Sequence, residues 1–202
     1  MNTPKLKQAL SSSAARQSIS TETGLAAAAT VARIADNEEV DYALAGGIAM
    51  HLYGFTRATV DVDMIASKLL ELPAKADLTF GGKTYQVDLN QQTVEVDWIV
   101  RNDEKAFLYE AALAEAEETA EGLAIVSPEW MVLLKHFAGR GKDEMDLLWL
   151  LRQDDLVDRQ LLMNIVKQMF GRFAFTVEQE MEHWFLQADL MKAKDERSDR
   201  TQ

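Results

Sequence analysis

The chain contains no cysteine and only three histidines and three prolines among its 202 residues. Without cysteine there is neither a disulfide nor a thiolate metal site, which fits a reducing compartment. The scarcity of histidine argues against a zinc site with imidazole ligands. The sequence also lacks an apolar signal core and any apolar run near the roughly 18 residues of a membrane span. We therefore expect a cytoplasmic protein without a membrane partner.

Positive charge is also scarce. The chain has 21 Lys and Arg against 33 Asp and Glu, a formal net charge of −12. Binding to long duplex DNA requires clustered basic residues that displace counterions, so such DNA is not an expected partner. A free nucleotide carried with Mg²⁺, or local contact with an RNA end, is compatible with this charge. The 48% hydrophobic content is typical of a globular protein with a substantial core.

The most informative stretch is residues 42–66. Residues 42–45 are apolar and precede Gly46-Gly47, which predicts a buried strand ending in a tight turn. Residues 48–53 then suit a short helix. Backbone N–H groups at such a glycine turn and helix N-terminus favour phosphate binding. A Gly-Gly pair before a helix is, however, more often just a tight turn.

The next expected strand, residues 60–66, alternates apolar and acidic side chains. Asp61 and Asp63 should therefore project from one face. Two like charges held this close repel, and a divalent cation resolves the conflict. Mg²⁺ prefers oxygen ligands and often takes one or two carboxylates plus substrate phosphates. Asp-x-Asp alone is commonly a solvated strand face, but a Gly-Gly turn about a dozen residues upstream makes the signal stronger.

A third carboxylate is expected from the strand at residues 93–101. Asp97 has apolar neighbours, which favours a position at the margin of a core. The alternative is that Glu95 and Asp97 mark a solvated face. Asp88, on the preceding strand, competes for the same role.

Three motifs together resemble a known family: Gly46-Gly47, Asp61-Val62-Asp63 and Asp97. Over roughly residues 25–152 the chain resembles the nucleotidyltransferase superfamily with the DNA polymerase β palm-type fold. The resemblance implies that the three aspartates hold two Mg²⁺ ions, with Mn²⁺ as an alternative. It also implies that Asp97 completes the metal site and can act as general base, and that a nucleoside triphosphate is the substrate.

Two further segments resemble the small bacterial branch of toxin–antitoxin and abortive-infection systems: Arg57-x-Thr59 before the acidic strand, and Lys135…Arg140-x-Lys142-Asp143-x-x-Asp146. In that branch the second segment lies near the nucleotide pocket. The implied nucleotide-binding residues are Gly46, Gly47, Arg57, Thr59, Lys135, Arg140, Lys142 and Asp143.

Chemistry alone leaves other interpretations of these segments open. The second segment also suits a loop with a capping Asp143 and a surface Lys–Asp pair. Arg57 equally suits an ion pair to Asp61 or Asp63. His51, on the short helix, is interpreted as a packing or hydrogen-bonding residue rather than a catalyst.

Together with these patterns, the resemblance implies an α+β fold: a nucleotidyltransferase-type mixed sheet flanked by helices, with a C-terminal helical region. The expected parts are a flexible N-terminal arm (1–22), a nucleotidyltransferase core (23–126) and a helical region packed on the core (127–202). Further expected elements are helices at 24–35, 104–119, 158–170 and 177–194, a helix opening at Ser127-Pro128, and a hairpin around Gly81-Gly82. The relative direction of the first two strands is left open.

The sequence therefore predicts a Mg-dependent nucleotidyltransferase that transfers a nucleoside monophosphate from an NTP to a hydroxyl on a protein, an RNA 3′ end or a small molecule. It could be a toxin-type enzyme. The second hypothesis is a weak or inactive nucleotide- or partner-binding module of a toxin–antitoxin-like pair with a cognate partner protein. A third, an Asp-x-Asp of the sugar-nucleotide transferase kind, is disfavoured by the short core and the upstream Gly-Gly turn.

Overall fold

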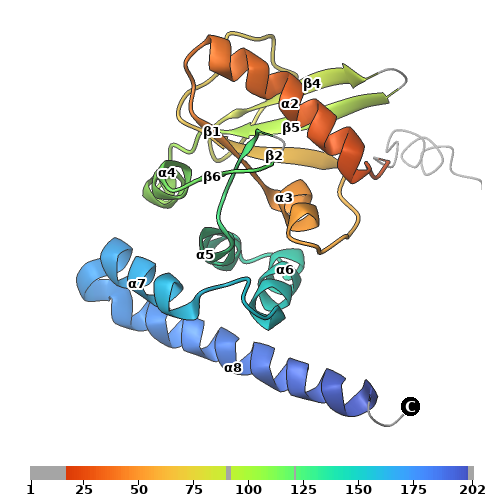
Figure 1. Ribbon diagram of the computed structural model, residues 1–202. Helices are drawn as coiled ribbons and strands as arrows, with labels where there is room; N and C mark the ends of the chain where they lie inside the picture. Colours follow the sequence, from red (N-terminus) through yellow and green to blue (C-terminus); the bar gives the residue numbers. More distant parts are fainter. Residues whose placement is uncertain (1–16, 90–91, 121, 200–202) are drawn as a thin grey trace, which may run out of the picture.

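The computed structural model describes residues 17–89, 92–120 and 122–199 and shows a mixed α+β fold (Figure 1). Its elements are, in chain order, α2 (Thr21–Asn37), β1 (Tyr42–Ala45), α3 (Gly46–Leu52), β2 (Asp61–Ala66), β3 (Ala76–Asp77), β4 (Lys83–Leu89), β5 (Gln92–Ile99), α4 (Ala106–Ala114), β6 (Glu117–Glu118), β7 (Ala124–Ile125), α5 (Pro128–Ala138), α6 (Gly141–Arg152), α7 (Arg159–Phe170), the 3₁₀ turn η1 (Gly171–Phe173) and α8 (Ala174–Asp199). The predicted fold class, a mixed sheet flanked by helices with a helical C-terminal region, is confirmed.

The strands form one seven-stranded sheet in the order β3-β4-β5-β2-β1-β7-β6. At its centre β1 runs antiparallel to β2, which answers the open question of strand direction. On its other side β2 runs parallel to β5, and β5 pairs antiparallel with β4. The C-terminal end of β1, where the glycine turn opens α3, therefore lies beside Asp63 of β2, and Asp63 lies beside Asp97 of β5. The hairpin predicted around Gly81-Gly82 corresponds to the antiparallel pair of β3 with β4, although its first strand is Ala76–Asp77 rather than residues 78–80.

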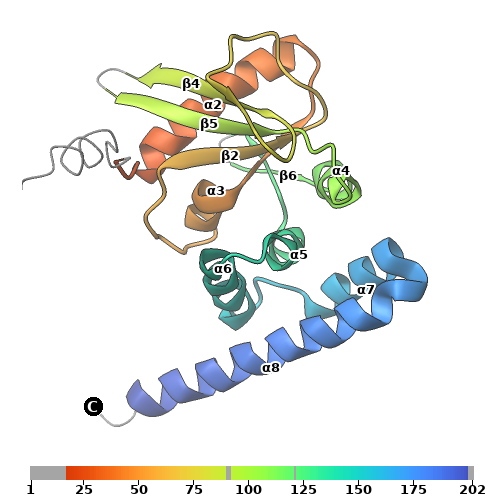
Figure 2. The same cartoon turned by 180° about the vertical axis from the view of Figure 1, so that it is seen from behind.

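The sheet is covered by helices with apolar faces. Helix α2 lies across one face of the sheet, and Figures 1 and 2 show α3 and α4 on the side toward the C-terminal helices. Alternation along β5 buries Val94, Val96 and Trp98, as the sequence predicts. The long helix α8 packs along α6 and α7. Within the described ranges, none of the helices has the length and apolar character to cross a membrane.

Several predicted boundaries are wrong, each for a local reason. Helix α2 begins at Thr21, because the Ser20 side chain accepts a hydrogen bond from the Thr23 backbone N–H. Helix α4 stops at Ala114 rather than continuing to 119, because residues 117–118 pair as β6 with β7. Helix α8 begins at Ala174, directly after the 3₁₀ turn, so position 176 lies inside it.

Two segments predicted to be irregular also join the fold. Helix α6 starts at Gly141, so Lys142, Asp143 and Asp146 are helical rather than part of a loop. Of the predicted N-terminal arm, residues 1–16 lie outside the described residues. Ile19 is buried, and its N–H donates to the Thr59 carbonyl at 2.9 Å, so the packed part of the chain includes residues before 23.

Candidate functional site

The predicted acidic residues lie where β2 and β5 run side by side. Asp63 pairs with Asp97 in the parallel ladder, and Asp61 pairs with Glu95. Paired side chains of neighbouring strands project from the same face, so Asp63 and Asp97 lie side by side, with Asp61 two residues along. Burial, and then the charge of Asp61, raise the pKa of Asp63 to about 6; Asp97 adds to this effect and Lys135 opposes it.

Of the two candidates for the third carboxylate, Asp97 lies beside Asp63 and Asp88 does not. The buried Thr84 on β4 faces Asp97 in the ladder, and its hydroxyl donates to Asp97 Oδ1 at 2.7 Å. Asp88 is exposed at the far end of the same hairpin, where it accepts a hydrogen bond from Thr93 at 2.6 Å. The strand pairing therefore separates two residues that the sequence left as competitors.

Asp61, Asp63 and Asp97 are the candidate metal ligands on this face. In the part of the chain that the structure describes, no group of three His, Cys, Asp or Glu side chains is gathered closely enough to hold a metal by itself. Mg²⁺ does not require such a group, since it commonly takes one or two carboxylates and completes its shell with water and substrate phosphates. Burial is the main cause of the raised pKa of Asp63, the charges of Asp61 and Asp97 add to it, and a bound cation would favour the ionised carboxylate. Asp63 and Asp97 therefore fit a Mg²⁺ ion that arrives with a phosphate ligand.

The glycine turn is packed directly against this acidic face. Gly46 has a φ of +61°, and a Cβ at this position would lie 1.8 Å from Asp63 Oδ2. A Cβ on Gly47 would lie 2.5 Å from the hydroxyl oxygen of Thr59. A side chain at Gly46 would therefore have to displace Asp63, and one at Gly47 would have to displace Thr59. Ala45, the N-cap residue of α3, forms no side-chain hydrogen bond to the helix. It therefore leaves the first backbone N–H groups of α3 without a side-chain cap.

Thr59 contacts both the glycine turn and the acidic strand. Its side chain is buried against Gly47, and its hydroxyl lies 3.3 Å from both the backbone carbonyl and Oδ1 of Asp61. This placement makes Thr59 a support for the turn and for Asp61. His51, in α3, makes hydrogen-bond contacts with Thr21 Oγ1 at 2.9 Å and the Arg57 carbonyl at 2.6 Å, in agreement with the hydrogen-bonding role predicted for it.

Lys135 is buried rather than at the surface, which corrects the alternative of a surface Lys–Asp pair. Its side chain lies 2.9 Å from Asp143 Oδ1 and 2.7 Å from Asp146 Oδ2. Lys135 is 6% exposed and both aspartates are 0% exposed. A buried ion pair of this kind is strongly destabilised when one partner is removed, because the other charge is left uncompensated.

Two arginines complete this network: the side chain of Arg57 is 16% exposed, whereas that of Arg140 is 62% exposed. Arg57 forms two hydrogen bonds to Asp146, at 2.6 and 2.7 Å, so its partner is neither Asp61 nor Asp63. Arg140 forms two bonds to Asp143. The network thus joins the loop before β2 to α5 and α6 through three cations and two carboxylates. It leaves a net positive charge close to the acidic face.

A small cavity of about 60 Å³ lies between the two halves of the site. Residues from both halves line it, among them Gly46, Asp63, Lys135, Arg140 and Asp143. By liquid volume it holds about two water molecules, so a nucleotide would lie mainly outside it. Lys142 is exposed nearby, and its charge lowers the pKa of Asp63.

Sequence reasoning missed Tyr109 on α4, which also lines this cavity. Burial raises its pKa, against the opposing effect of Arg101, whose guanidinium lies 4.8 Å from the ring centroid. Arg101 is in turn fixed by Asp103. A single tyrosine within an Ala-rich helical segment gives no motif, so only the packing of α4 against β2 could identify it.

No family model matches the chain, and no significant match exists among curated proteins. Among solved structures, the chain is similar to an antigenic nucleotidyltransferase-like protein from Paracoccidioides brasiliensis, with 17% sequence identity and a TM-score of 0.46. The similarity covers 75% of this chain and 90% of that chain.

Proposed function

We propose that this chain is a nucleotidyltransferase that transfers a nucleoside monophosphate from an NTP to a hydroxyl acceptor. One observation carries the proposal: Asp63 lies beside Asp97 on a parallel strand, while Gly46 packs against its carboxylate. The three motifs that carry the family resemblance thus meet at one place. The acceptor hydroxyl would belong to a protein, an RNA 3′ end or a small molecule.

Mg²⁺ would be held by Asp63 and Asp97, with Asp61 at the edge; the resemblance implies two ions, with Mn²⁺ as an alternative. When bound, the metal would stabilise the attacking and leaving oxygens of an in-line displacement. The carboxylates must be ionised to serve as ligands. Because its pKa is raised to about 6, Asp63 is mainly ionised at neutral pH and protonated in mild acid.

The remaining residues would position the nucleotide and offset its charge. The acceptor oxygen forms a bond to the α-phosphorus, the bond from that phosphorus to the bridging oxygen breaks, and pyrophosphate leaves. Asp97 would take the proton of the attacking hydroxyl. The Gly46-Gly47 amides would bind phosphate oxygens, and Arg140 and Lys142 would balance phosphate charge. Positioning and electrostatics are the main contributions that phosphoryl transfer asks of a protein.

The direct test is transfer of label from an NTP labelled at the α-phosphate, in the presence of Mg²⁺ and candidate acceptors. Wild-type protein should label an acceptor, and Asp63→Asn should abolish the labelling. Asp88→Asn is the matched control, since it removes one carboxylate from an exposed position on β4. Labelling that persists in Asp63→Asn would remove the basis of the proposal.

A second candidate function is a weak or inactive nucleotide- or partner-binding module of a toxin–antitoxin-like pair. It is favoured by one observation: Arg57, Lys135 and Arg140 are already bound to Asp143 and Asp146. Calorimetry with a non-hydrolysable NTP would show binding without product in that case. Growth arrest on expression that is lost in Asp61→Ala would instead support a toxin-type enzyme, and its relief by a co-expressed protein would identify a cognate partner.

A further inference from the structure

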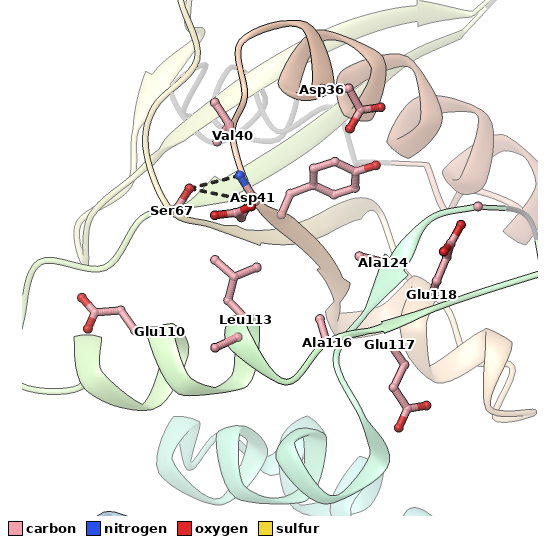
Figure 3. Close-up of a pocket in the computed structure, with 13 residues that line it drawn as sticks. Asp36, Val40, Asp41, Ser67, Glu110, Leu113, Ala116, Glu117, Glu118 and Ala124 are labelled. Carbon is pink, nitrogen blue, oxygen red and sulfur yellow. Dashed lines mark hydrogen bonds between the residues drawn. The ribbon is translucent and has the colours of Figure 1, made fainter.

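A second, larger cavity lies away from the acidic face described above, at the opposite end of β1 (Figure 3). It is a groove of about 850 Å³ between the end of α2, the start of β1, α4 and the β6–β7 pair. We call it the acidic groove. It is lined by Asp36, Val40, Asp41, Tyr42, Ser67, Glu110, Leu113, Ala114, Ala116, Glu117, Glu118, Gly122 and Ala124. Its volume lies in the range of binding pockets for ligands larger than a single side chain.

The rim of the groove carries five carboxylates: Asp36, Asp41, Glu110, Glu117 and Glu118. Neither Lys nor Arg is among the described residues that line it. The structure records no ion pair for any of these five within its described part. Some acidic residues elsewhere on the surface do form ion pairs: Asp154, Asp189 and Asp195 each pair with a Lys or Arg.

The floor of the groove is apolar. Val40 is buried, and Leu113, Ala116 and Ala124 lie between the acidic side chains (Figure 3). Lys and Arg bury their aliphatic stems on apolar surface while the charged head stays at a polar rim. The pKa of the Tyr42 hydroxyl is raised, first by burial and then by the negative charge of Asp36, with a smaller effect from Glu118.

The groove also lies at the edge of the sheet. Strand β6 is the last strand in the sheet order, and β7 pairs with β1 only at Leu44 and Ile125. An edge strand exposes backbone groups that an extended peptide can pair with, and the two residues of β6 offer few of them. An extended segment lying in the groove would direct every second side chain toward its floor.

We propose that the acidic groove is a docking site for an extended, Lys- or Arg-bearing segment of a partner protein. Charge complementarity supports this occupant, because an acidic rim with no ion pair among the described residues, above an apolar floor, matches the charged head and aliphatic stem of a basic side chain. The proposal does not depend on nucleotide chemistry. Its test therefore needs no NTP, and its failure leaves the proposed function untouched.

The test is binding of a fluorescein-labelled, end-capped peptide of alternating lysine and alanine to the full chain, followed by fluorescence anisotropy. Binding should weaken with added salt, and a glutamate–alanine peptide should not bind. The triple variant Glu110→Gln, Glu117→Gln, Glu118→Gln should weaken binding at least about tenfold. The matched control is Glu71→Gln, Glu182→Gln, Glu196→Gln, which removes three exposed carboxylates away from the groove and should change affinity by less than about twofold. Far-UV circular dichroism and thermal melting confirm that both variants fold.

Three outcomes would overturn the proposal. The first is no binding of the basic peptide by wild-type protein. The second is equal weakening in both triple variants, which would show general attraction to an acidic chain. The third is spermine displacing the peptide while itself binding more tightly at the same groove, which would make it a polyamine site. Hydrogen-exchange protection in α4 and β6 on adding peptide would support the docking site directly.

Discussion

Gly46 packs so closely against the side chain of Asp63 that a Cβ on Gly46 would overlap it. A Cβ on Gly46 would lie 1.8 Å from Asp63 Oδ2, 2.5 Å from its Cγ and 2.7 Å from its Cβ. Gly46 also has a φ of +61°, which L-residues with a Cβ adopt reluctantly. The contact ties the glycine turn to the acidic strand, so a change at one should be felt at the other.

Gly46→Ala should therefore lower both stability and activity. Strain at the positive φ, together with displacement of the Asp63 carboxylate, should cost about 1–3 kcal/mol, measured by urea unfolding. NTP-dependent labelling should fall much further, because Asp63 moves away from Asp97. Gly141→Ala is the control: a Cβ there meets nothing within 4 Å, so the helical α6 should keep its stability or gain up to about 1 kcal/mol. Full activity in Gly46→Ala would contradict the proposed role of the contact.

Asp63 should make folding stability depend on pH in an unusual direction. Burial and the charges of Asp61 and Asp97 raise its pKa from 3.8 to about 6. Below about pH 4 the carboxyl is protonated in both folded and unfolded chains, and it causes no penalty. As the pH rises through 6, the folded chain must give up a proton that it holds more tightly, so this residue lowers stability.

Asp63→Asn removes that penalty. In EDTA the variant should be about 1–3 kcal/mol more stable than wild type at pH 7.5, and about equally stable at pH 4. Urea unfolding at the two pH values measures the difference. A variant less stable than wild type at pH 7.5 would show that the Asp63 charge is compensated in the fold. The same substitution should abolish labelling, which separates the role in function from the role in stability.

The acidic face and the glycine turn could be predicted because they depend on local rules. Alternation along residues 60–66 places Asp61 and Asp63 on one face, and the glycines mark a turn whatever the rest of the chain does. The choice between Asp97 and Asp88 could not be made, because it depends on the pairing of β2 with β5, which no local pattern encodes.

The network around Lys135 could not be predicted for a related reason. Lysine is almost never buried unless it is paired, so the sequence alone also allows a surface Lys–Asp pair in this segment. Asp143 and Asp146 reach Lys135 only because residues 141–152 form a helix packed on α5. Helix α4 was extended too far because its Ala- and Glu-rich continuation favours a helix, whereas pairing of β6 with β7 overrides that preference.

Asp97 and Asp88 should respond differently to the same substitution. Asp97→Asn changes a carboxylate beside Asp63 that Thr84 holds in place, so labelling activity should fall by a factor of about 100 or more. Asp88→Asn changes an exposed carboxylate and should leave activity within about twofold of wild type. Steady-state kinetics on both variants measures the contrast. Equal losses would show that the strand pairing does not select the functional carboxylate.

Asp146 should contribute far more to folding stability than an aspartate on the exposed face of a helix. It is 0% exposed and binds both Arg57 and Lys135, so Asp146→Asn leaves three cations facing the one carboxylate of Asp143. The expected loss is about 3–5 kcal/mol in urea unfolding. Asp195→Asn is the matched control, since this aspartate pairs with Arg152 but its side chain is 66% exposed. Its loss should be at most about 1 kcal/mol, because water and salt screen an exposed pair. If the two variants lost the same stability, the ion pairs joining α5, α6 and the loop before β2 would not hold the site together.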